Sequence, residues 1–334
     1  MNLSDKKHDA QHEILLRLLF YGAPKTRKTW LAGTAAEAGF NTILLDMDHG
    51  YHILLDNLSE QAQKRLMLIE CRDSLKAARA CTFMSQFLKS SNVWFDEEEK
   101  RTILLPQELN DNCVELDAQK HLNKNTVLII DSYTALVASL HFQYAKENSI
   151  DLSDAKKTDW EGYGWAGRLA SWMLEKISQL PCHVIVIGHK SVYEKYSGSK
   201  KDRKLEWARQ QIKSVSNPHA MTIGDKFSDI LYFESVSSIR TTIDTRPGKD
   251  REGGSRVIAP NLYDWNKLQF ADICKHAHIN LPPADLPYLD FSIDKELIEA
   301  AHQKANTQAS NPINPKATKA KLSGLAGLLN KSGV

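Results

Sequence analysis

Residues 14–34 read Ile-Leu-Leu-Arg-Leu-Leu-Phe-Tyr-Gly-Ala-Pro-Lys-Thr-Arg-Lys-Thr-Trp-Leu-Ala-Gly-Thr. The apolar run at 14–20 predicts a buried strand, Gly22 opens a short loop, and a helix is expected to begin near Lys28. A strand, a short loop and a helix N-terminus in this order are typical of a P-loop, in which backbone N–H groups face an anionic phosphate.

The loop fits the motif G-x-x-x-x-G-K-[ST] at every position except one, because Arg27 stands where the second Gly is expected. The motif predicts that Lys28 reaches the β- and γ-phosphates of a nucleotide and that the Thr29 hydroxyl ligates Mg2+. Arg27 would either strain the loop or add charge to the phosphates. An ordinary basic turn between a strand and a helix is the alternative. The candidate nucleotide-binding residues are Gly22, Ala23, Pro24, Lys25, Thr26, Arg27, Lys28 and Thr29.

The composition indicates a folded protein without a dominant charge. The chain has 334 residues, of which 42% are hydrophobic, and a formal net charge of +2. Any nucleic-acid signal must therefore be local. The five Cys residues are odd in number and lack paired C-x-x-C spacing, which favours a reducing cytoplasm over a disulfide framework. The N-terminus has no apolar signal region and no window holds eighteen apolar residues, so neither secretion nor a membrane span is expected.

Two apolar strands are predicted to end in acids. The run at 41–46 leads into Asp46 and Asp48, and the run at 126–131 ends in Asp131, followed by Ser132. In a doubly wound sheet, strand ends of this kind meet at the edge that binds ligands. We expect Asp131 to complete the Mg2+ shell beside Thr29, and Asp46 or Asp48 to polarise the attacking water. Solvated strand ends are the alternative.

A further buried strand at 183–189 ends in His189. This side chain is expected at the same edge as Asp131, where it could hydrogen-bond the γ-phosphate and report its presence to the loop beyond. A capping or solvent-facing His is the alternative.

The segment from 190 to 213 carries the sharpest local charge signal, with Tyr193, Tyr196 and Trp207 interleaved among eight cations and three acids. Cations attract phosphates and aromatic rings stack on unpaired bases, so the segment resembles a surface for single-stranded DNA. A solvated, partly helical insertion is the alternative. The candidate DNA-binding residues are Lys190, Lys195, Lys200, Lys201, Arg203 and Lys204.

The C-terminal third offers weaker signals. Alternating runs at 229–236 and 238–246 predict neighbouring strands at a sheet edge. In an oligomeric ATPase, Arg246 and Lys249 could reach the nucleotide of a neighbouring subunit. An amphipathic helix is expected from 261, followed by a Pro-rich link. Residues 300–334 hold five Lys and no acid, which is typical of a flexible basic tail that could dock on a partner.

In this order, the motifs resemble the RecA-type ATPase core over about residues 12–260. Leu128-Ile-Ile-Asp-Ser-Tyr-Thr-Ala-Leu136 is similar to the Walker B segment of that family, and Asp48 stands where the family carries its catalytic Glu. His189 stands where RecA proteins place a nucleotide-sensing Gln, and 190–222 corresponds to their second DNA-binding loop. Residues 145–165 match the first such loop more loosely. The nearest branch is phage-type, with proteins of single-strand annealing and recombination. Arg27 and the shorter acid at Asp48 depart from the pattern.

The resemblance implies an α/β fold: a RecA-like P-loop NTPase core with a mainly parallel central sheet, flanking helices and antiparallel edge strands. It implies an N-terminal arm at 1–12, a core at 13–280 with an insertion at 92–125 and the basic loop at 190–222, and a link and tail at 281–334.

The implied activity is hydrolysis of ATP with Mg2+, stimulated by single-stranded DNA, in annealing or strand exchange. Lys28, Asp48 and His189 are the implied catalytic residues, and Thr29 and Asp131 the metal ligands. The implied partners are single-stranded DNA, further copies of the chain in a ring or filament, and a single-strand binding protein at the tail. Two alternatives stay open: a degenerate P-loop protein with a scaffolding role, favoured by Arg27, and a P-loop kinase for a small molecule.

Overall fold

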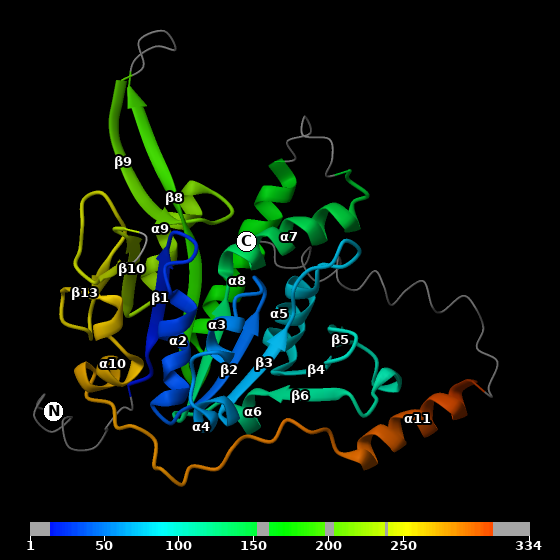
Figure 1. Cartoon of the computed structure of the whole chain (residues 1–334). Helices are drawn as coiled ribbons and strands as arrows, with labels where there is room; N and C mark the ends of the chain where they lie inside the picture. Colours follow the sequence, from blue (N-terminus) through cyan, green and yellow to red (C-terminus); the bar gives the residue numbers. More distant parts are fainter. Residues whose placement is uncertain (1–13, 152–159, 198–203, 238–239, 310–334) are drawn as a thin grey trace, which may run out of the picture.

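The computed structural model describes residues 14–151, 160–197, 204–237 and 240–309. A large sheet runs through the middle of this part of the chain, with helices on both faces (Figure 1). Its strand order is β13-β11-β10-β1-β8-β7-β2-β3. These strands are β13 Leu262–Asp264, β11 Thr241–Asp244, β10 Asp229–Ser235, β1 Arg17–Gly22, β8 His183–Ser197, β7 Thr126–Asp131, β2 Asn41–Asp46 and β3 Leu66–Glu70.

The strands from β10 to β3 pair in parallel, and β11 and β13 add an antiparallel edge. The predicted fold class is therefore confirmed. Strand β8 lies between β1, which leads into the phosphate loop, and β7, which ends in Asp131. Because parallel strands end at one edge, the ends of β1, β8, β7 and β2 bring the predicted functional residues together.

Apolar residues cover both faces of the central strands, which is why these strands read as continuous apolar runs. In β1, Leu18 and Phe20 face one core cluster, whereas Leu19 and Tyr21 face the other. The first cluster is covered by α2 Lys28–Glu37, α3 His52–Leu55, α4 Glu60–Lys64 and α10 Phe270–His276. The second is covered by α5 Arg79–Ser90, α7 Tyr133–Glu147, α8 Trp160–Ser178 and α9 Asn217–Ile223.

The basic segment after His189 is a β-hairpin. Strand β8 continues beyond the central sheet and pairs with β9 Lys204–Ile212 in antiparallel register. Lys190 pairs with Ile212 at the base of the hairpin, and Ser197 pairs with Lys204 at its far end. The two strands project from the body as a long arm (Figure 1).

The insertion forms a small antiparallel sheet of β5 Arg101–Ile103, β4 Asn92–Asp96 and β6 Cys113–Asp117. An extended strap after α10 runs along the body to this sheet, since Asn41 Nδ2 donates to Pro287 O at 3.0 Å and Glu115 N donates to Phe291 O at 2.8 Å. Helix α11 Lys295–Ala309 follows and packs on the small sheet through Ile298.

Two C-terminal predictions need comment. The helix expected from 261 is wrong in its first part: Leu262–Asp264 pair with β11 as β13, and α10 begins only at Phe270, behind a capping box of Gln269 and Asp272. The first part of the expected tail, residues 300–309, belongs to the helix α11, and its remainder, residues 310–334, lies outside the described residues, as does the N-terminal arm.

Candidate functional site

The phosphate loop begins where two strands touch. A Cβ at Gly22 would lie 2.1 Å from the backbone oxygen of Phe233 in β10, so only glycine fits at the end of β1. The loop then turns through two residues with left-handed backbone, Lys25 at φ 61° and Arg27 at φ 65°. Arg27 is the N-cap of α2, at the position that the motif gives to glycine.

Lys28 is turned into this loop. Its side chain is almost completely buried, and its Nζ donates to Ala23 O at 2.7 Å and to Thr26 Oγ1 at 3.2 Å. Burial lowers the pKa of Lys28 to about 8, although Asp131 and Asp48 raise it. A buried cation next to the N-terminus of α2, whose first turn holds no acid, suits a triphosphate.

Oxygen atoms gather beside the loop. Thr29 Oγ1 donates to Asp131 Oδ2 at 2.5 Å, and Asp46 is the direct neighbour of Asp131 in the register of β2 and β7. Asp46 Oδ1 accepts from Gly50 N at 3.0 Å, whereas Asp46 Oδ2 is buried and has no hydrogen-bond partner within the described part of the chain. Mg2+ prefers oxygen ligands, so Thr29 and Asp131 fit the predicted metal site. Asp46 could supply a further oxygen ligand. The sequence had suggested Asp46 only as a base for the attacking water.

The electrostatics of this cluster fit a cation as well. Burial, together with the neighbouring Asp48 and Asp46, raises the pKa of Asp131 to about 7, although Thr29 and Lys28 oppose the shift. Burial likewise raises the pKa of Asp46. Two buried carboxyls on adjacent strands repel each other as anions, and a divalent cation would remove this cost.

The pKa of Asp131 predicts how Mg2+ acts on stability. In the folded state the Asp131 carboxyl stays protonated up to about pH 7, whereas in the unfolded chain it loses its proton at about pH 4. Without Mg2+, the free energy of unfolding should therefore fall as the pH rises through this window. Mg2+ binds the ionised carboxylate, so we expect it to raise the melting temperature by several degrees at about pH 8 and much less at about pH 6.

Differential scanning fluorimetry with Mg2+ at both pH values measures this effect. The variant Asp131→Asn should show no difference between them. Equal stabilisation of the wild type at both pH values would contradict the role of Asp131.

Ser132 and His189 both contact Asp48, close to the candidate metal ligands. Strand β2 ends at Asp46, so Asp48 lies in the following loop, where its Oδ2 accepts from Ser132 Oγ at 2.5 Å. His189 Nε2 lies 3.6 Å from the same oxygen, and the backbone N–H of His189 donates to Thr134 Oγ1 at 2.9 Å. Burial lowers the pKa of His189, which Asp48 partly offsets, so the ring is neutral near pH 7. The three predicted catalytic residues thus lie at one edge of the sheet. Lys28 follows β1, His189 lies in β8, and Asp48 follows β2.

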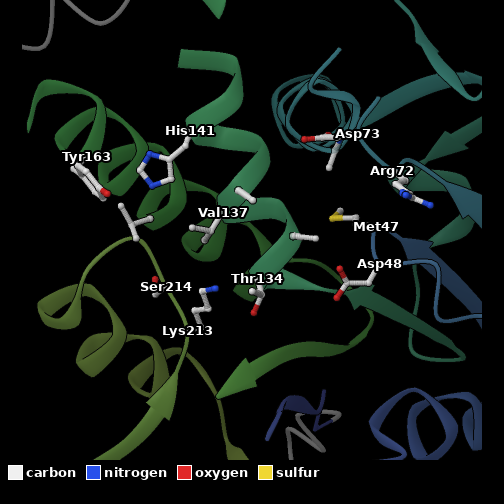
Figure 2. Close-up of a pocket in the computed structure, with 14 residues that line it drawn as sticks. Met47, Asp48, Arg72, Asp73, Thr134, Val137, His141, Tyr163, Lys213 and Ser214 are labelled. Atoms are coloured by element: carbon white, nitrogen blue, oxygen red, sulfur yellow. The ribbon is translucent and has the colours of Figure 1, made fainter. Parts of the chain in front are cut away.

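A pocket of about 590 Å³ opens next to Asp48. Figure 2 shows Asp48 and Met47 on one side of it, Lys213 and Ser214 on the opposite side, and Thr134 and Val137 of α7 between them, with His141 of α7 next to Tyr163. A second hollow of about 450 Å³ shares Tyr163, Lys213, Ser214 and Val215 with the first and extends to Trp160 and Ser191. Together the two hollows form what we term the edge groove, which leads from Asp48 to the base of the β8–β9 hairpin. The sequence did not predict this groove.

The predicted DNA-binding cations have different surroundings. Lys190 points into the base of the hairpin, where its Nζ donates to Gln210 Oε1 at 3.2 Å and Tyr232 Oη at 3.1 Å. Lys195 forms an ion pair of 3.2 Å with Glu206, and Lys204 is exposed. Lys200, Lys201 and Arg203 lie outside the described residues. Tyr193 and Trp207 lie on one face of the hairpin with ring centroids 5.3 Å apart.

Of the two cations predicted to act on a neighbouring subunit, Arg246 is held within its own chain. Its Nε and Nη2 donate to the two carboxylate oxygens of Asp244 at 2.9 and 2.8 Å. Lys249 is exposed in the turn that follows.

A comparison with known protein families found a match. A family model described as an AAA domain matches residues 15–257, which span the phosphate loop, both acid-tipped strands, the hairpin and the antiparallel edge. No curated protein matches the chain.

Proposed function

We propose that this chain, which belongs to the family of AAA domains, is a RecA-like ATPase that uses Mg2+. We further propose that it acts on single-stranded DNA in phage-type recombination or replication, by annealing or strand exchange. The nucleotide-binding part rests on the family and on the phosphate loop. The observation that carries the DNA-dependent part is the edge groove, which joins Asp48 to the hairpin.

Within this proposal each residue at the sheet edge has one task. Lys28 and the N-terminus of α2 hold the β- and γ-phosphates, and Thr29 and Asp131 hold Mg2+, with Asp46 behind them. Asp48 accepts a proton from the attacking water. Ser132 and His189 both contact Oδ2 of Asp48 and would hold this carboxylate in place.

The surroundings of the edge groove suit a single strand. Lys213 and Arg72 contribute cations, while Trp160 and Tyr163 at the start of α8 expose 80% and 45% of their surface. Their ring centroids lie 6.4 Å apart. Cations attract phosphates and exposed rings stack on unpaired bases without regard to sequence, which is what a protein for annealing or strand exchange requires.

His189 would connect the two sites. It lies 3.6 Å from Asp48, and its carbonyl accepts from Lys213 N at 2.7 Å, so one residue contacts both the catalytic acid and the wall of the groove. A nucleotide that moves His189 would also move Lys213.

We expect Trp160→Ala to weaken binding of single-stranded DNA about tenfold, because one stacked base contributes roughly 1–3 kcal/mol. Most of the Trp160 surface is exposed, so the variant should keep its melting temperature. Titration of a labelled oligonucleotide by fluorescence anisotropy, with and without ATP, measures the affinity. Tyr288→Ala is the matched control, because Tyr288 is also an exposed aromatic residue but lies on the strap. DNA affinity that is equal for wild type and Trp160→Ala would contradict the groove as the DNA site.

The proposal includes self-association in a ring or filament and a single-strand binding protein as partner of the C-terminal tail. Lys249 is the exposed cation available to a neighbouring nucleotide, and Arg246 would have to exchange its contact with Asp244 for one in the next subunit. Sedimentation with and without nucleotide tests the assembly.

A cytoplasmic location is also proposed, and the five cysteines support it because all of them are buried and free. Among the described helices, none has both the length and the apolar composition that crossing a bilayer requires.

A small-molecule kinase is the second candidate function, and the part of the edge groove beside Asp48 favours it. About 590 Å³ is enough for a small acceptor, and the lining offers both cations and carboxylates. Hydrolysis and transfer are distinguished by the product: a kinase would consume ATP when an acceptor is added and leave the phosphoryl group on the acceptor, with little release of inorganic phosphate, and DNA would not change the rate.

A further inference from the structure

We propose that Trp265 is a positioning residue for the nucleotide site: its ring holds the guanidinium of Arg27 and thereby keeps the phosphate loop in the left-handed turn that a glycine would otherwise provide. The inference rests on the proposed binding of ATP and adds a residue outside the loop to it.

The turn at Arg27 is costly for any residue with a side chain. Its backbone lies at φ 65° and ψ 22°, in the left-handed region, where a Cβ crowds the following carbonyl group. The next two residues are Lys28 and Thr29, and the carbonyl of Arg27 accepts from Leu31 N at 3.1 Å as the first turn of α2 begins. A change in the backbone at 27 would therefore redirect the N–H groups and the cation that face the phosphates.

The side chain of Arg27 offsets this cost by a contact away from the loop. Its guanidinium carbon lies 3.7 Å from the ring centroid of Trp265, which is the distance of a stacked cation–π pair. Within the described residues, the guanidinium has no ion pair and no hydrogen bond, so the indole is its main contact. The guanidinium of Arg27 thus lies on the indole of Trp265, a contact that its place in the motif had not suggested.

Trp265 is held against α2, the helix that follows the phosphate loop. It opens the turn Trp265–Lys267 after β13 and packs against the core cluster that includes α2. Five residues later, Phe270 N donates to Thr34 Oγ1 of α2 at 2.9 Å, and the rings of Phe270 and Phe40 pack edge to face at 5.3 Å. The segment 265–276 thus holds the indole still relative to α2.

Trp265 and Arg27 lie on opposite sides of the end of the family match. The family match ends at residue 257, so the ring lies outside it, whereas Arg27 lies inside. The chain carries an unusual residue in the loop and, outside the matched region, the aromatic ring that accommodates it.

The test is a double-mutant cycle read as the affinity for ATP with Mg2+ in full-length protein, measured by isothermal titration calorimetry. We expect Trp265→Ala to weaken ATP binding about tenfold in the wild-type background, because a left-handed residue and a cation–π pair each contribute on the order of one tenfold step. When Arg27 is replaced by Gly, the turn no longer needs a partner, and adding Trp265→Ala should change the affinity less than about twofold.

The controls separate positioning from packing and from the proposed function. Trp265→Phe keeps a ring beneath the guanidinium and should retain most of the affinity. Melting temperatures without nucleotide report the loss of packing, which is common to both backgrounds, together with the loss of the cation–π pair, which occurs only with Arg27. Equal weakening of ATP binding by Trp265→Ala with Arg27 and with Arg27→Gly would overturn the inference, as would no weakening at all. If wild-type protein does not bind ATP, the proposed function fails instead.

Discussion

Replacing Lys28 by Ala is expected to abolish measurable ATP binding, with a loss of at least about a hundredfold. The side chain is the one buried cation of the loop within the described residues, and its Nζ lies against Ala23 O and Thr26 Oγ1, where the loop closes around the phosphates. Charge-assisted contacts to phosphate are among the strongest in proteins, and removal of one at a desolvated site costs several kcal/mol. Calorimetric titration with ATP and Mg2+ measures the effect.

A loss of folding would be recognised in the same experiment. Burial disfavours the charge of Lys28 and lowers its pKa to about 8, so removal of this cation should not reduce the melting temperature of the nucleotide-free protein. An exposed cation distant from the loop, Lys89 at the end of α5, provides the control variant Lys89→Ala. If Lys28→Ala binds ATP as the wild type does, the loop is not the phosphate site.

The second large effect is expected at Asp48. Asp48→Asn should slow ATP hydrolysis by about a hundredfold or more, since the amide cannot take a proton from water, while ATP affinity changes less than about threefold. The Ser132 hydroxyl can still donate to the amide oxygen, so the loop should stay in place. Release of inorganic phosphate under saturating ATP measures the rate, and calorimetry measures the affinity.

Two further variants make the result at Asp48 specific. Asp48→Glu keeps the carboxylate and should retain turnover, whereas Asp56→Asn, an exposed acid after α3, should behave as the wild type. Full activity of Asp48→Asn would exclude Asp48 as the base. His189 or Asp46 would then be the candidate for that role.

The elements near the phosphate site could be predicted because each carries its own local signal. A continuous apolar run ending in Asp131 predicts a central parallel strand, and β7 occupies those residues. Gly22, Lys28 and Thr29 have fixed spacing within one loop, so their joint position follows from the motif alone. The order of these signals along the chain also indicates which strand ends share an edge.

Other features depend on contacts between distant residues. The left-handed turn at Arg27 has an explanation only once Trp265 is found against it, and nothing in the spacing of the two residues indicates that contact. Asp46 and Asp48 are only two positions apart, but β2 ends between them, so Asp46 stays next to Asp131 in the sheet while Asp48 turns toward Ser132. The role of Asp46 is visible only in the register of β2 and β7.

The β8–β9 hairpin was not predicted, because its charged residues interrupt the alternation by which a strand is recognised in a sequence. Lys190–Ser197 alternates Tyr193 and Lys195 on one face with Val192 and Glu194 on the other, which is a ribbon exposed on both faces and lacks the apolar-to-polar alternation of a half-buried strand. The helix predicted from 261 failed for a related reason: Leu262, Trp265 and Leu268 have helical spacing but belong to β13 and the turn after it, where pairing with β11 overrides the pattern.

Release of inorganic phosphate from ATP by the full-length protein, with and without single-stranded DNA, is the most direct measurement of the proposed function. We predict turnover that requires Mg2+, rises when DNA is added, falls again as salt displaces the DNA, and is absent in Lys28→Ala. No phosphate release under any of these conditions, from protein that is folded and binds DNA, would contradict the ATPase and point to a scaffolding P-loop protein instead.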